Sequence, residues 1–193
     1  LSQVTLLATS SSDCDGDGVT NAAEINGPDG VVGGGDSTIP TDPCSLNLSQ
    51  VTLTATSTGD CDGDGVTNAN EINSTGTGDP QTDPNDPCAY NEAEQGTPSA
   101  TWDSADCDGD GVTNGQEILN GTDPNDPCSL VLASVTLLAT STSDCDGDGV
   151  TNAAEINGPD GVVGGGDSTN PTDPCSFNMT QGTLLATSTG DWG

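Results

Sequence analysis

Apolar residues occur in short segments, separated by stretches rich in Asp, Gly, Ser and Thr. Segments such as 135–143 place Val and Leu among threonines, which predicts short β-strand linkers. The stretch 21–26 follows Thr20 and precedes Gly27, which predicts a short helix with an N-capping Thr and a terminating Gly. The same signals recur after Thr67, Thr113 and Thr151. Helices this short are not stable alone, so the fold needs another source of order.

One pattern returns four times along the chain: a linker, an Asp-rich loop, a short helical segment and a Pro-containing closure with a cysteine. The predicted repeats are residues 1–47, 48–90, 91–131 and 132–178, and residues 179–193 start a further one. Residues 5–47 recur almost unchanged at 136–178, so a longer module restarts as well. This organisation is typical of tandem arrays. We expect an elongated rather than globular fold of mostly irregular loops, and a chain cut from a longer array.

Few residues can form a hydrophobic core. Leu, Ile, Val and Phe together make 31 of 193 residues, and the chain has 31 Asp and Glu but no Lys, Arg or His. A formal charge of −31 without internal cations opposes compaction, and such a composition is typical of disorder. We therefore expect metal ions and disulfides to supply the order, as they do in small secreted modules.

Each repeat contains Asp-Cys-Asp-Gly-Asp-Gly-Val-Thr-Asn and then a Glu, which completes the spacing D-x-D-x-D-G-x-x-x-x-x-E. Carboxylates at loop positions 1, 3, 5 and 12, a Gly at the sharp turn and a backbone carbonyl at position 7 suit the oxygen shell of Ca²⁺. Mg²⁺ needs a tighter octahedron, and Zn²⁺ prefers Cys or His. A solvated Asp-Gly turn is the alternative for one copy, but four copies in register favour calcium. The predicted ligands are Asp13, Asp15, Asp17, Val19 and Glu24; Asp60, Asp62, Asp64, Val66 and Glu71; Asp106, Asp108, Asp110, Val112 and Glu117; and Asp144, Asp146, Asp148, Val150 and Glu155.

The closures share the sequence Thr-Asp-Pro. Because a residue before Pro avoids the helical conformation, each of these aspartates is expected to turn extended with its carboxylate facing outward. These side chains could complete the shell of their own loop or hold a second calcium between repeats; the alternative is a solvated turn. They are Asp42, Asp83, Asp123 and Asp173.

Eight cysteines come as one pair per repeat: Cys14, Cys44, Cys61, Cys88, Cys107, Cys128, Cys145 and Cys175. Without a C-x-x-C pair or a histidine, a disulfide framework in an oxidising compartment is favoured over zinc ligation. Two pairings stay open. Pairing within repeats (14–44, 61–88, 107–128, 145–175) uses all eight cysteines, whereas pairing across linkers (44–61, 88–107, 128–145) closes shorter gaps and leaves the end cysteines to neighbouring segments.

No apolar run approaches the length of a membrane span, and no signal sequence opens the chain. The strong acidity excludes nucleic acids and anionic membranes as partners, because both need basic patches.

The run 106–128 closely resembles the bacterial thrombospondin type-3 repeat, a calcium-binding module of long secreted and cell-surface proteins, often adhesins. The other three repeats fit this pattern with insertions. The loops differ from an EF-hand, which has its aliphatic residue at position 8 and a helix before the loop, whereas Val19 stands at position 7 after a Thr-rich linker. The resemblance implies a calcium-stiffened spacer in an extracellular array, with the loop ligands named above, and does not imply an enzyme.

Glycosylation is a further expectation for the Ser/Thr-rich surface. N-x-S/T triplets and Asp-Ser/Thr-x triplets provide candidate attachment sites. These are Asn47, Asn73, Asn120 and Asn178 for N-linked sugars, and Ser37, Ser104 and Ser168 for O-linked sugars.

The favoured function is structural: a segment of an extracellular fibre or stalk, on the cell surface, that assembles with itself or continues the same array. The alternative is a calcium-dependent, dockerin-like recognition module, which usually presents an apolar or aromatic cluster. The four aromatic residues here are scattered, which favours the structural function. Enzymatic activity is not expected, because acid-base chemistry would rest on carboxylates in a chain with too little core to build a cleft.

Overall fold

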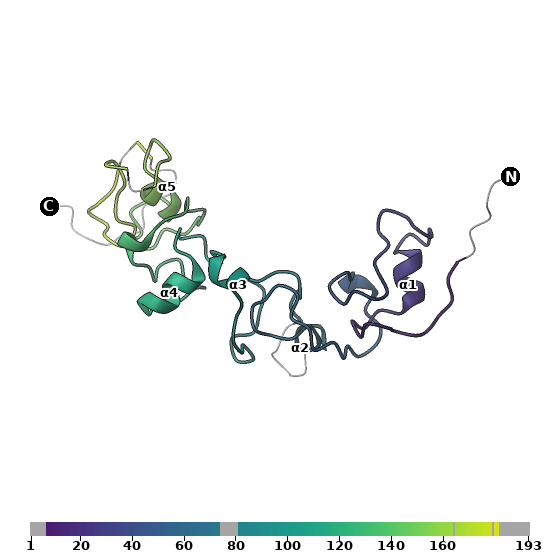
Figure 1. The fold of residues 1–193 in the computed structure, drawn as a ribbon. Helices are drawn as coiled ribbons and strands as arrows, with labels where there is room; N and C mark the ends of the chain where they lie inside the picture. Colours follow the sequence, from purple (N-terminus) through teal and green to yellow (C-terminus); the bar gives the residue numbers. More distant parts are fainter. Residues whose placement is uncertain (1–6, 74–80, 164, 179, 182–193) are drawn as a thin grey trace. The chain divides into compact units, whose positions relative to one another are not determined.

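The computed structural model describes residues 7–73, 81–163, 165–178 and 180–181. It divides into two compact bodies, Leu1–Trp102 and Asp103–Gly193. Each body consists of loops that wind around short helices (Figure 1). The boundary falls inside the third predicted repeat, and the division into four repeats stays a prediction. No helix of the described residues is long and apolar enough to cross a membrane.

The described residues form five short α-helices: α1 (Asn21–Asn26), α2 (Asn68–Asn73), α3 (Ala100–Ser104), α4 (Asn114–Asn120) and α5 (Asn152–Asn157). Two 3-10 helices, Leu48–Gln50 and Leu132–Ser134, follow closures.

The predicted threonine caps are confirmed for α1 and α5 but not for α4. Thr20 and Thr151 accept hydrogen bonds from the backbone N–H groups of Ala23 and Ala154. Thr113 begins α4 in an extended conformation but makes no side-chain cap. Gly27, Gly121 and Gly158 end their helices. The helices are therefore local features whose ends are fixed by single residues.

The prediction of β-strand linkers is wrong for the described residues, which contain no strand. The linker N–H groups bond to glycine carbonyls of the preceding Asp-rich loop instead of to a neighbouring strand. Thr52 and Leu53 both donate to Gly18 O at 3.0 Å, and Thr56 and Ser57 donate to Gly16 O. Linker 135–143 makes the same paired bonds to Gly111 and Gly109. Propensity favours an extended chain but does not choose its hydrogen-bond partner.

The apolar core is small and lies at the loops. The Val at position 7 of every loop is at most 1% exposed: Val19, Val66, Val112 and Val150. Trp102, Ile72 and Ile156 are also buried, and Trp102 makes an edge-to-face contact with Tyr90 at 6.0 Å between ring centroids. Buried polar residues outnumber these apolar ones, so hydrophobic burial is not the main source of order.

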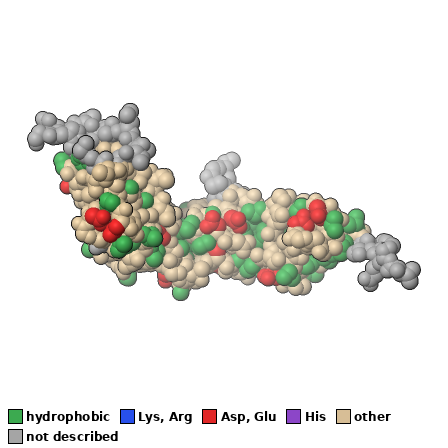
Figure 2. Space-filling view, turned by 90° about the horizontal axis from the view of Figure 1, so that it is seen from above, with side chains coloured by type: hydrophobic (Ala, Val, Ile, Leu, Met, Phe, Trp, Pro, Cys, Tyr) green, Lys and Arg blue, Asp and Glu red, His purple; other side chains and the backbone are tan. Residues whose placement is uncertain are grey.

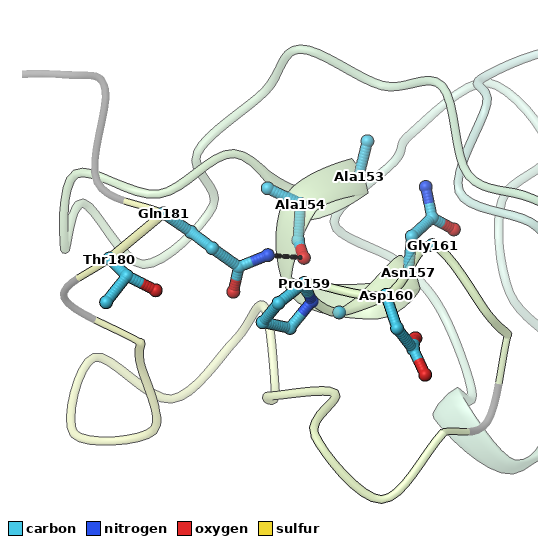
Figure 3. Close-up of a pocket in the computed structure, with 9 residues that line it drawn as sticks. Ala153, Ala154, Asn157, Pro159, Asp160, Gly161, Thr180 and Gln181 are labelled. Carbon is cyan, nitrogen blue, oxygen red and sulfur yellow. Dashed lines mark hydrogen bonds between the residues drawn. The ribbon is translucent and has the colours of Figure 1, made fainter.

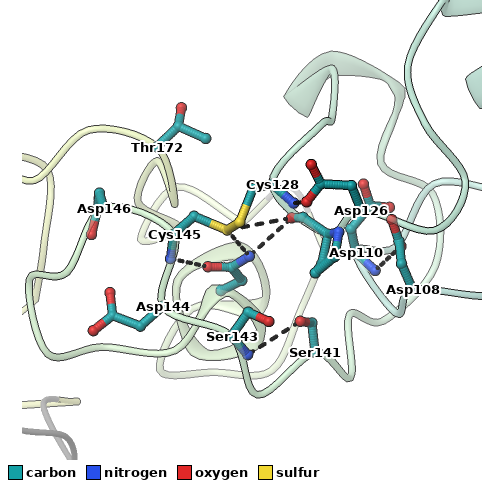
Figure 4. Close-up of a disulfide and its surroundings, with 12 residues drawn as sticks. Asp108, Asp110, Asp126, Cys128, Ser141, Ser143, Asp144, Cys145, Asp146 and Thr172 are labelled. Atoms are coloured by element: carbon teal, nitrogen blue, oxygen red, sulfur yellow. Dashed lines mark hydrogen bonds between the residues drawn. A yellow bond between two sulfur atoms is a disulfide. The ribbon is translucent and has the colours of Figure 1, made fainter.

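The disulfides follow the pairing across linkers. Cys44 bonds to Cys61 and Cys128 bonds to Cys145 (Figure 4), with Cα atoms 5.5 and 5.6 Å apart. Cys88 and Cys107 are also disulfide-bonded. Pairing within repeats is therefore wrong at these cysteines.

Cys14 and Cys175, both predicted to form disulfides, are free and exposed. In the pattern observed, each closure cysteine bonds to the loop cysteine of the next repeat. The chain has no closure cysteine before Cys14 and no loop cysteine after Cys175.

A shallow pocket lies beside α5, where the segment after the closure crosses the helix (Figure 3). Gln181 Nε2 donates to Ala154 O at 2.8 Å, and Gln50 Nε2 makes the equivalent bond to Ala23 O at 3.1 Å. The pocket thus results from a repeated contact that ties the post-closure segment to the helix of the preceding repeat.

Candidate calcium loops

Three aspartates converge in each Asp-rich loop. In every triplet, one carboxylate oxygen of each Asp lies within 4.8 Å of the others: Asp13, Asp15 and Asp17; Asp60, Asp62 and Asp64; Asp106, Asp108 and Asp110; and Asp144, Asp146 and Asp148. On the face drawn in Figure 2, acidic side chains gather in small separate groups. Such convergence of like charges costs free energy unless a cation enters the group.

The loop backbone orients these side chains. Asp13 accepts hydrogen bonds with both oxygens, from Gly16 N at 2.8 Å and Gly18 N at 3.0 Å. Asp15 Oδ1 accepts from Asp17 N, and Asp17 Oδ1 accepts from Val19 N at 2.8 Å. The other three loops make the same bonds. These hydrogen bonds fold the chain into a loop. At positions 3 and 5, the second carboxylate oxygen of each Asp receives no hydrogen bond from the backbone.

Those remaining oxygens are buried and make no hydrogen bond. In the first loop they are Asp15 Oδ2 and Asp17 Oδ2, together with Glu24 Oε2 from position 12. The equivalent oxygens are unpartnered in every loop: Asp62 Oδ2, Asp64 Oδ2 and Glu71 Oε2; Asp108 Oδ2, Asp110 Oδ2 and both oxygens of Glu117; and Asp146 Oδ2, Asp148 Oδ2 and Glu155 Oε2. A buried anionic oxygen without a partner is costly, and this chain has no cationic side chain to supply one. The donor set, oxygen only and acidic, fits Ca²⁺.

The position-12 glutamates reach the loops from the short helices. Glu24, Glu117 and Glu155 are fully buried, and Glu71 is 2% exposed. A closure threonine holds the far oxygen in three repeats: Thr38, Thr82 and Thr169 donate to Glu24, Glu71 and Glu155 Oε1 at 3.3, 3.1 and 3.0 Å. Thr122 donates to the backbone carbonyl of Glu117 instead. Sequence reasoning missed these threonines, although each begins a Thr-x-Pro triplet in the closure.

Burial and mutual repulsion raise the pKa values of the loop carboxyls. Burial is the largest cause and nearby aspartates add to it, so the pKa of Glu24 is raised to about 7. The same causes raise the pKa of Glu71, Glu117 and Glu155 to about 8. Burial also raises the pKa of Asp17, Asp62, Asp110 and Asp146 to about 6, and that of Asp108 to about 7. Without a metal ion, the loops hold charge that the fold disfavours.

The loop glycine at position 6 permits close approach of the next linker. Gly18 has φ +88°, and a Cβ there would lie 2.9 Å from Leu53 O. Gly111 has φ +90°, and a Cβ there would lie 2.7 Å from Leu137 O. The glycine thus serves both the turn of its own loop and the contact with the following segment.

An asparagine at loop position 9 bonds to the cysteine of its loop. Asn152 accepts from Cys145 N at 3.1 Å and donates to Cys145 Sγ and to Pro127 O of the preceding closure. Asn68 makes the same three bonds to Cys61 and Pro43. Sequence reasoning missed this residue, whose only signal is its recurrence as the last residue of the repeated nine-residue motif.

The closure aspartates lie at the surface. Asp42, Asp83, Asp123 and Asp173 are exposed, and each accepts a hydrogen bond from the N–H two residues ahead. The hydrogen bonds also correct the alignment of the closures, because Ile39, Asp123 and Asn170 share the bond from their N–H group to a Ser hydroxyl six residues later. Asp42 and Asp173 are therefore equivalent to Asp126 rather than to Asp123. A metal role for these aspartates stays a prediction.

The candidate glycosylation sites differ in how their side chains are engaged. Asn73 uses its amide fully, accepting from Ala55 N and donating to Ala55 O. Ser37 and Ser168 donate to Ile25 O and Ile156 O. Asn47 and Asn178 are part-buried and accept bonds from residues 49 and 180. Asn120 Nδ2 is buried without a partner, and Ser104 is exposed.

The repeated loops were compared with known protein families. Three segments match the bacterial TSP3 repeat. They are residues 13–27, 106–127 and 144–158, so the match covers the first, third and fourth loops. The second loop, from Asp60 to Glu71, makes the same hydrogen bonds without lying in a matched segment. Comparison with curated proteins and with solved structures finds no match.

The family and the geometry agree on the type of site. TSP3 repeats bind calcium, and the Asp triplets of this chain have the spacing and the free oxygens to hold such an ion. The triplets and the position-12 glutamates would provide the carboxylate ligands, and the ion would supply the positive charge that the chain lacks. The contribution of the position-7 carbonyls stays a prediction.

Proposed function

We propose that the chain is a calcium-stiffened structural segment of an extracellular fibre or stalk. It carries no enzymatic role in this proposal. The observation that carries it is the position of the loops: within the described residues, the first three candidate calcium sites are each bonded directly to the linker of the following repeat. Thr136 and Leu137 both donate to Gly111 O, in the loop whose Asp110 Oδ2 is buried without a hydrogen-bond partner.

Three contacts transmit the order of a loop to its neighbour. The linker N–H groups bond to the loop carbonyls, the closure cysteine bonds to the next loop, and the position-9 asparagine bonds back to the closure proline. Because the loop between them is fixed by carboxylate hydrogen bonds, an ion that holds the carboxylates also holds the joined linker. Calcium binding is then coupled to the stiffness of consecutive repeats.

Disulfides favour an oxidising environment, which supports secretion. We propose attachment at the cell surface in a long filament or adhesin-like protein, with sugars on the exposed Ser, Thr and Asn residues. The fibre would arise from self-assembly or from continuation of the same array.

A calcium titration followed by small-angle scattering and far-UV circular dichroism tests the proposal. Loops of extracellular proteins often bind calcium with dissociation constants of about 10⁻⁴ to 10⁻³ M, so the titration should reach several times that range. We expect a defined, less variable conformation with calcium and no such change with magnesium. A matched variant with Asp17, Asp64, Asp110 and Asp148 replaced by Asn should not respond.

The proposal would be overturned if neither the scattering curve nor the circular dichroism spectrum changed on addition of calcium. Hydrolytic activity on a carbohydrate or peptide substrate that persists in the four-Asn variant would overturn the non-enzymatic part of it.

A further inference from the structure

The linker between the first and second loops is bonded on both sides. On one side, Ser57 N donates to Gly16 O of the first loop at 2.9 Å. On the other side, Ala69 N of α2 donates to Ser57 O at 3.2 Å. Ser57 is 8% exposed, so both bonds are shielded from water. One linker residue therefore joins a candidate calcium loop to the helix that carries Glu71, the position-12 glutamate of the next loop.

An asparagine at the end of the same helix also holds this linker. Asn73 Oδ1 accepts from Ala55 N at 2.8 Å, and Asn73 Nδ2 donates to Ala55 O at 2.9 Å. We call this pair of bonds the clasp. Asn73 lies two residues after Glu71, and Ala55 is only 3% exposed. The clasp therefore fixes the linker against the helix that presents the glutamate.

The linker also lies close to an aspartate of the first loop. The two oxygens of Asp13 accept from Gly16 N and Gly18 N. The carbonyls of these two glycines accept from the linker, for example Gly18 O from Leu53 N at 3.0 Å. Two glycine residues are thus all that separates a predicted calcium ligand from the linker that the clasp holds.

The third and fourth loops repeat this arrangement. Ser141 N donates to Gly109 O at 2.9 Å, and Ala153 N of α5 donates to Ser141 O at 3.2 Å. Asn157 makes the clasp with Ala139, with bonds of 3.0 and 2.8 Å. The first two loops lie in one compact body and the last two in the other. Each body therefore contains two loops that are joined by one clasped linker.

The helix of the third loop differs at the clasp position. The residue two places after the position-12 glutamate is Asn in α1, α2 and α5 but Leu119 in α4. A leucine side chain makes no hydrogen bond, and Leu119 is 82% exposed. The glycine carbonyls of the second loop accept from another type of segment, Gly65 O from Gly96 N and Gly63 O from Ser99 N. The clasp therefore joins loops within each pair and is absent from α4.

We propose that Asn73 and Asn157 are positioning residues that couple the calcium loops in two pairs, the first with the second and the third with the fourth. An ion in one loop orders its glycines and the linker bonded to them, and the clasp extends that order to the helix of the next loop. The second ion then has less conformational entropy to remove. Such coupling is reciprocal, so each loop of a pair raises the calcium affinity of the other by the same factor. This inference rests on the proposed function and specifies which sites act together.

A calcium titration of the isotope-labelled full chain tests the pairing loop by loop. The probes are the amide NMR signals of the glycine at position 4 of each loop: Gly16, Gly63, Gly109 and Gly147. Asp17→Asn combined with Glu24→Gln disables the first loop. In this variant the second loop should bind calcium at least about fivefold more weakly than in the unmodified chain. The third and fourth loops should keep their affinities.

Asn73→Leu separates positioning from a local loss of structure. The substitution introduces the residue type that α4 has at this position, and Asn70→Leu, at an exposed site of α2, is the matched control. With Asn73→Leu, disabling the first loop should no longer change the affinity of the second. With Asn70→Leu, the fivefold change should persist. A residue with only a structural role would weaken the second loop but leave its dependence on the first loop unchanged. Asn157→Leu with a disabled third loop repeats the test in the second pair.

Three results would overturn the proposal: a second loop whose affinity does not depend on the first, equal coupling between the second and third loops, or coupling that survives both Asn73→Leu and Asn157→Leu. Loops that bind calcium independently of one another reject this inference alone. Absence of calcium binding at all four loops of the unmodified chain rejects the proposed function as well.

Discussion

The hydroxyl of Thr169 donates a hydrogen bond of 3.0 Å to Glu155 Oε1, and the other oxygen of that glutamate is buried without a partner. The closure thus orients a carboxylate of the loop that lies 14 residues earlier. This bond leaves Oε2 free for an ion and explains why Thr recurs at the start of the closure.

Thr169→Val should weaken calcium binding at the fourth loop without removing it. Loss of one hydrogen bond to a carboxylate costs about 1.5 kcal/mol or more, which is roughly tenfold in affinity. The measurement is a calcium titration followed by the amide NMR signals of Gly147 and Gly149. Thr142→Val is the control, because Thr142 is exposed. Equal affinities for the two variants would show that Thr169 does not position Glu155.

Glu155→Gln should have opposite effects with and without calcium. The glutamate charge is disfavoured in the calcium-free fold, since burial and the loop aspartates raise its pKa to about 8. In a chelator at pH 9, the variant should therefore unfold at a higher denaturant concentration than the unmodified chain. In calcium it should lose at least about tenfold in affinity at this loop, because a carboxylate ligand is lost. A variant less stable in both conditions would contradict this assignment.

The stability of the calcium-free protein should fall as pH rises. Glu71 and Glu117 have pKa values of about 8 in the folded chain, against an ordinary value of 4.5. Between these values, the folded chain binds more protons than the unfolded chain, so the free energy of unfolding decreases with increasing pH. Denaturant titrations in a chelator should give a higher midpoint at pH 5 than at pH 8.

With calcium present, the trend should reverse. Protons compete with the ion for the same oxygens, so affinity should drop as pH falls below about 7. Calorimetry in buffers of different ionisation enthalpy should detect proton release on binding near pH 7. Absence of proton release at this pH would mean that the glutamates are already charged in the free loops.

Asn152→Ala should destabilise the calcium-bound protein more than Asn21→Ala. Asn152 is fully buried and bonds to Cys145 N and Pro127 O, so its loss leaves two backbone groups unpaired, at a cost of about 2 to 4 kcal/mol. Asn21 bonds to Cys14 N at a part-buried position, and its loss should cost about 1 kcal/mol. Thermal unfolding in calcium compares the two, and equal losses would show that the bond to the closure contributes nothing.

Gly111→Ala should be far more damaging than Gly121→Ala. Both glycines have positive φ, +90° and +75°, so each substitution carries backbone strain of about 1 kcal/mol. Only Gly111 also has a neighbouring carbonyl, Leu137 O, 2.7 Å from the added Cβ, while a Cβ at Gly121 meets nothing within 4 Å. Comparison of denaturation midpoints isolates the linker contact. Similar midpoints for the two variants would mean that the linker moves away from the loop at no cost.

Local signals determined the loops and helices. The alternation of Asp and Gly sets both the loop turn and the side-chain hydrogen bonds within it, and Thr20 and Gly27 fix the two ends of α1. These features depend on residues within one or two turns of chain, so the sequence alone was sufficient to predict them. The convergence of each Asp triplet could be predicted for the same reason, because its three residues are close together in the sequence.

Only the tertiary structure decided which distant segments meet. The cysteine pattern left two pairings open, and the contact between a closure and the next loop selected 44–61 and 128–145. The composition of the Thr-rich linkers predicted strands. In the folded chain, their N–H groups donate instead to the carbonyls of loop glycines, whose lack of a side chain permits close approach. A periodic pattern records which residues suit an extended chain or a turn. The tertiary fold sets the path of the chain between repeats. It therefore decides which hydrogen-bond partner, sulfur atom or carboxylate each residue contacts.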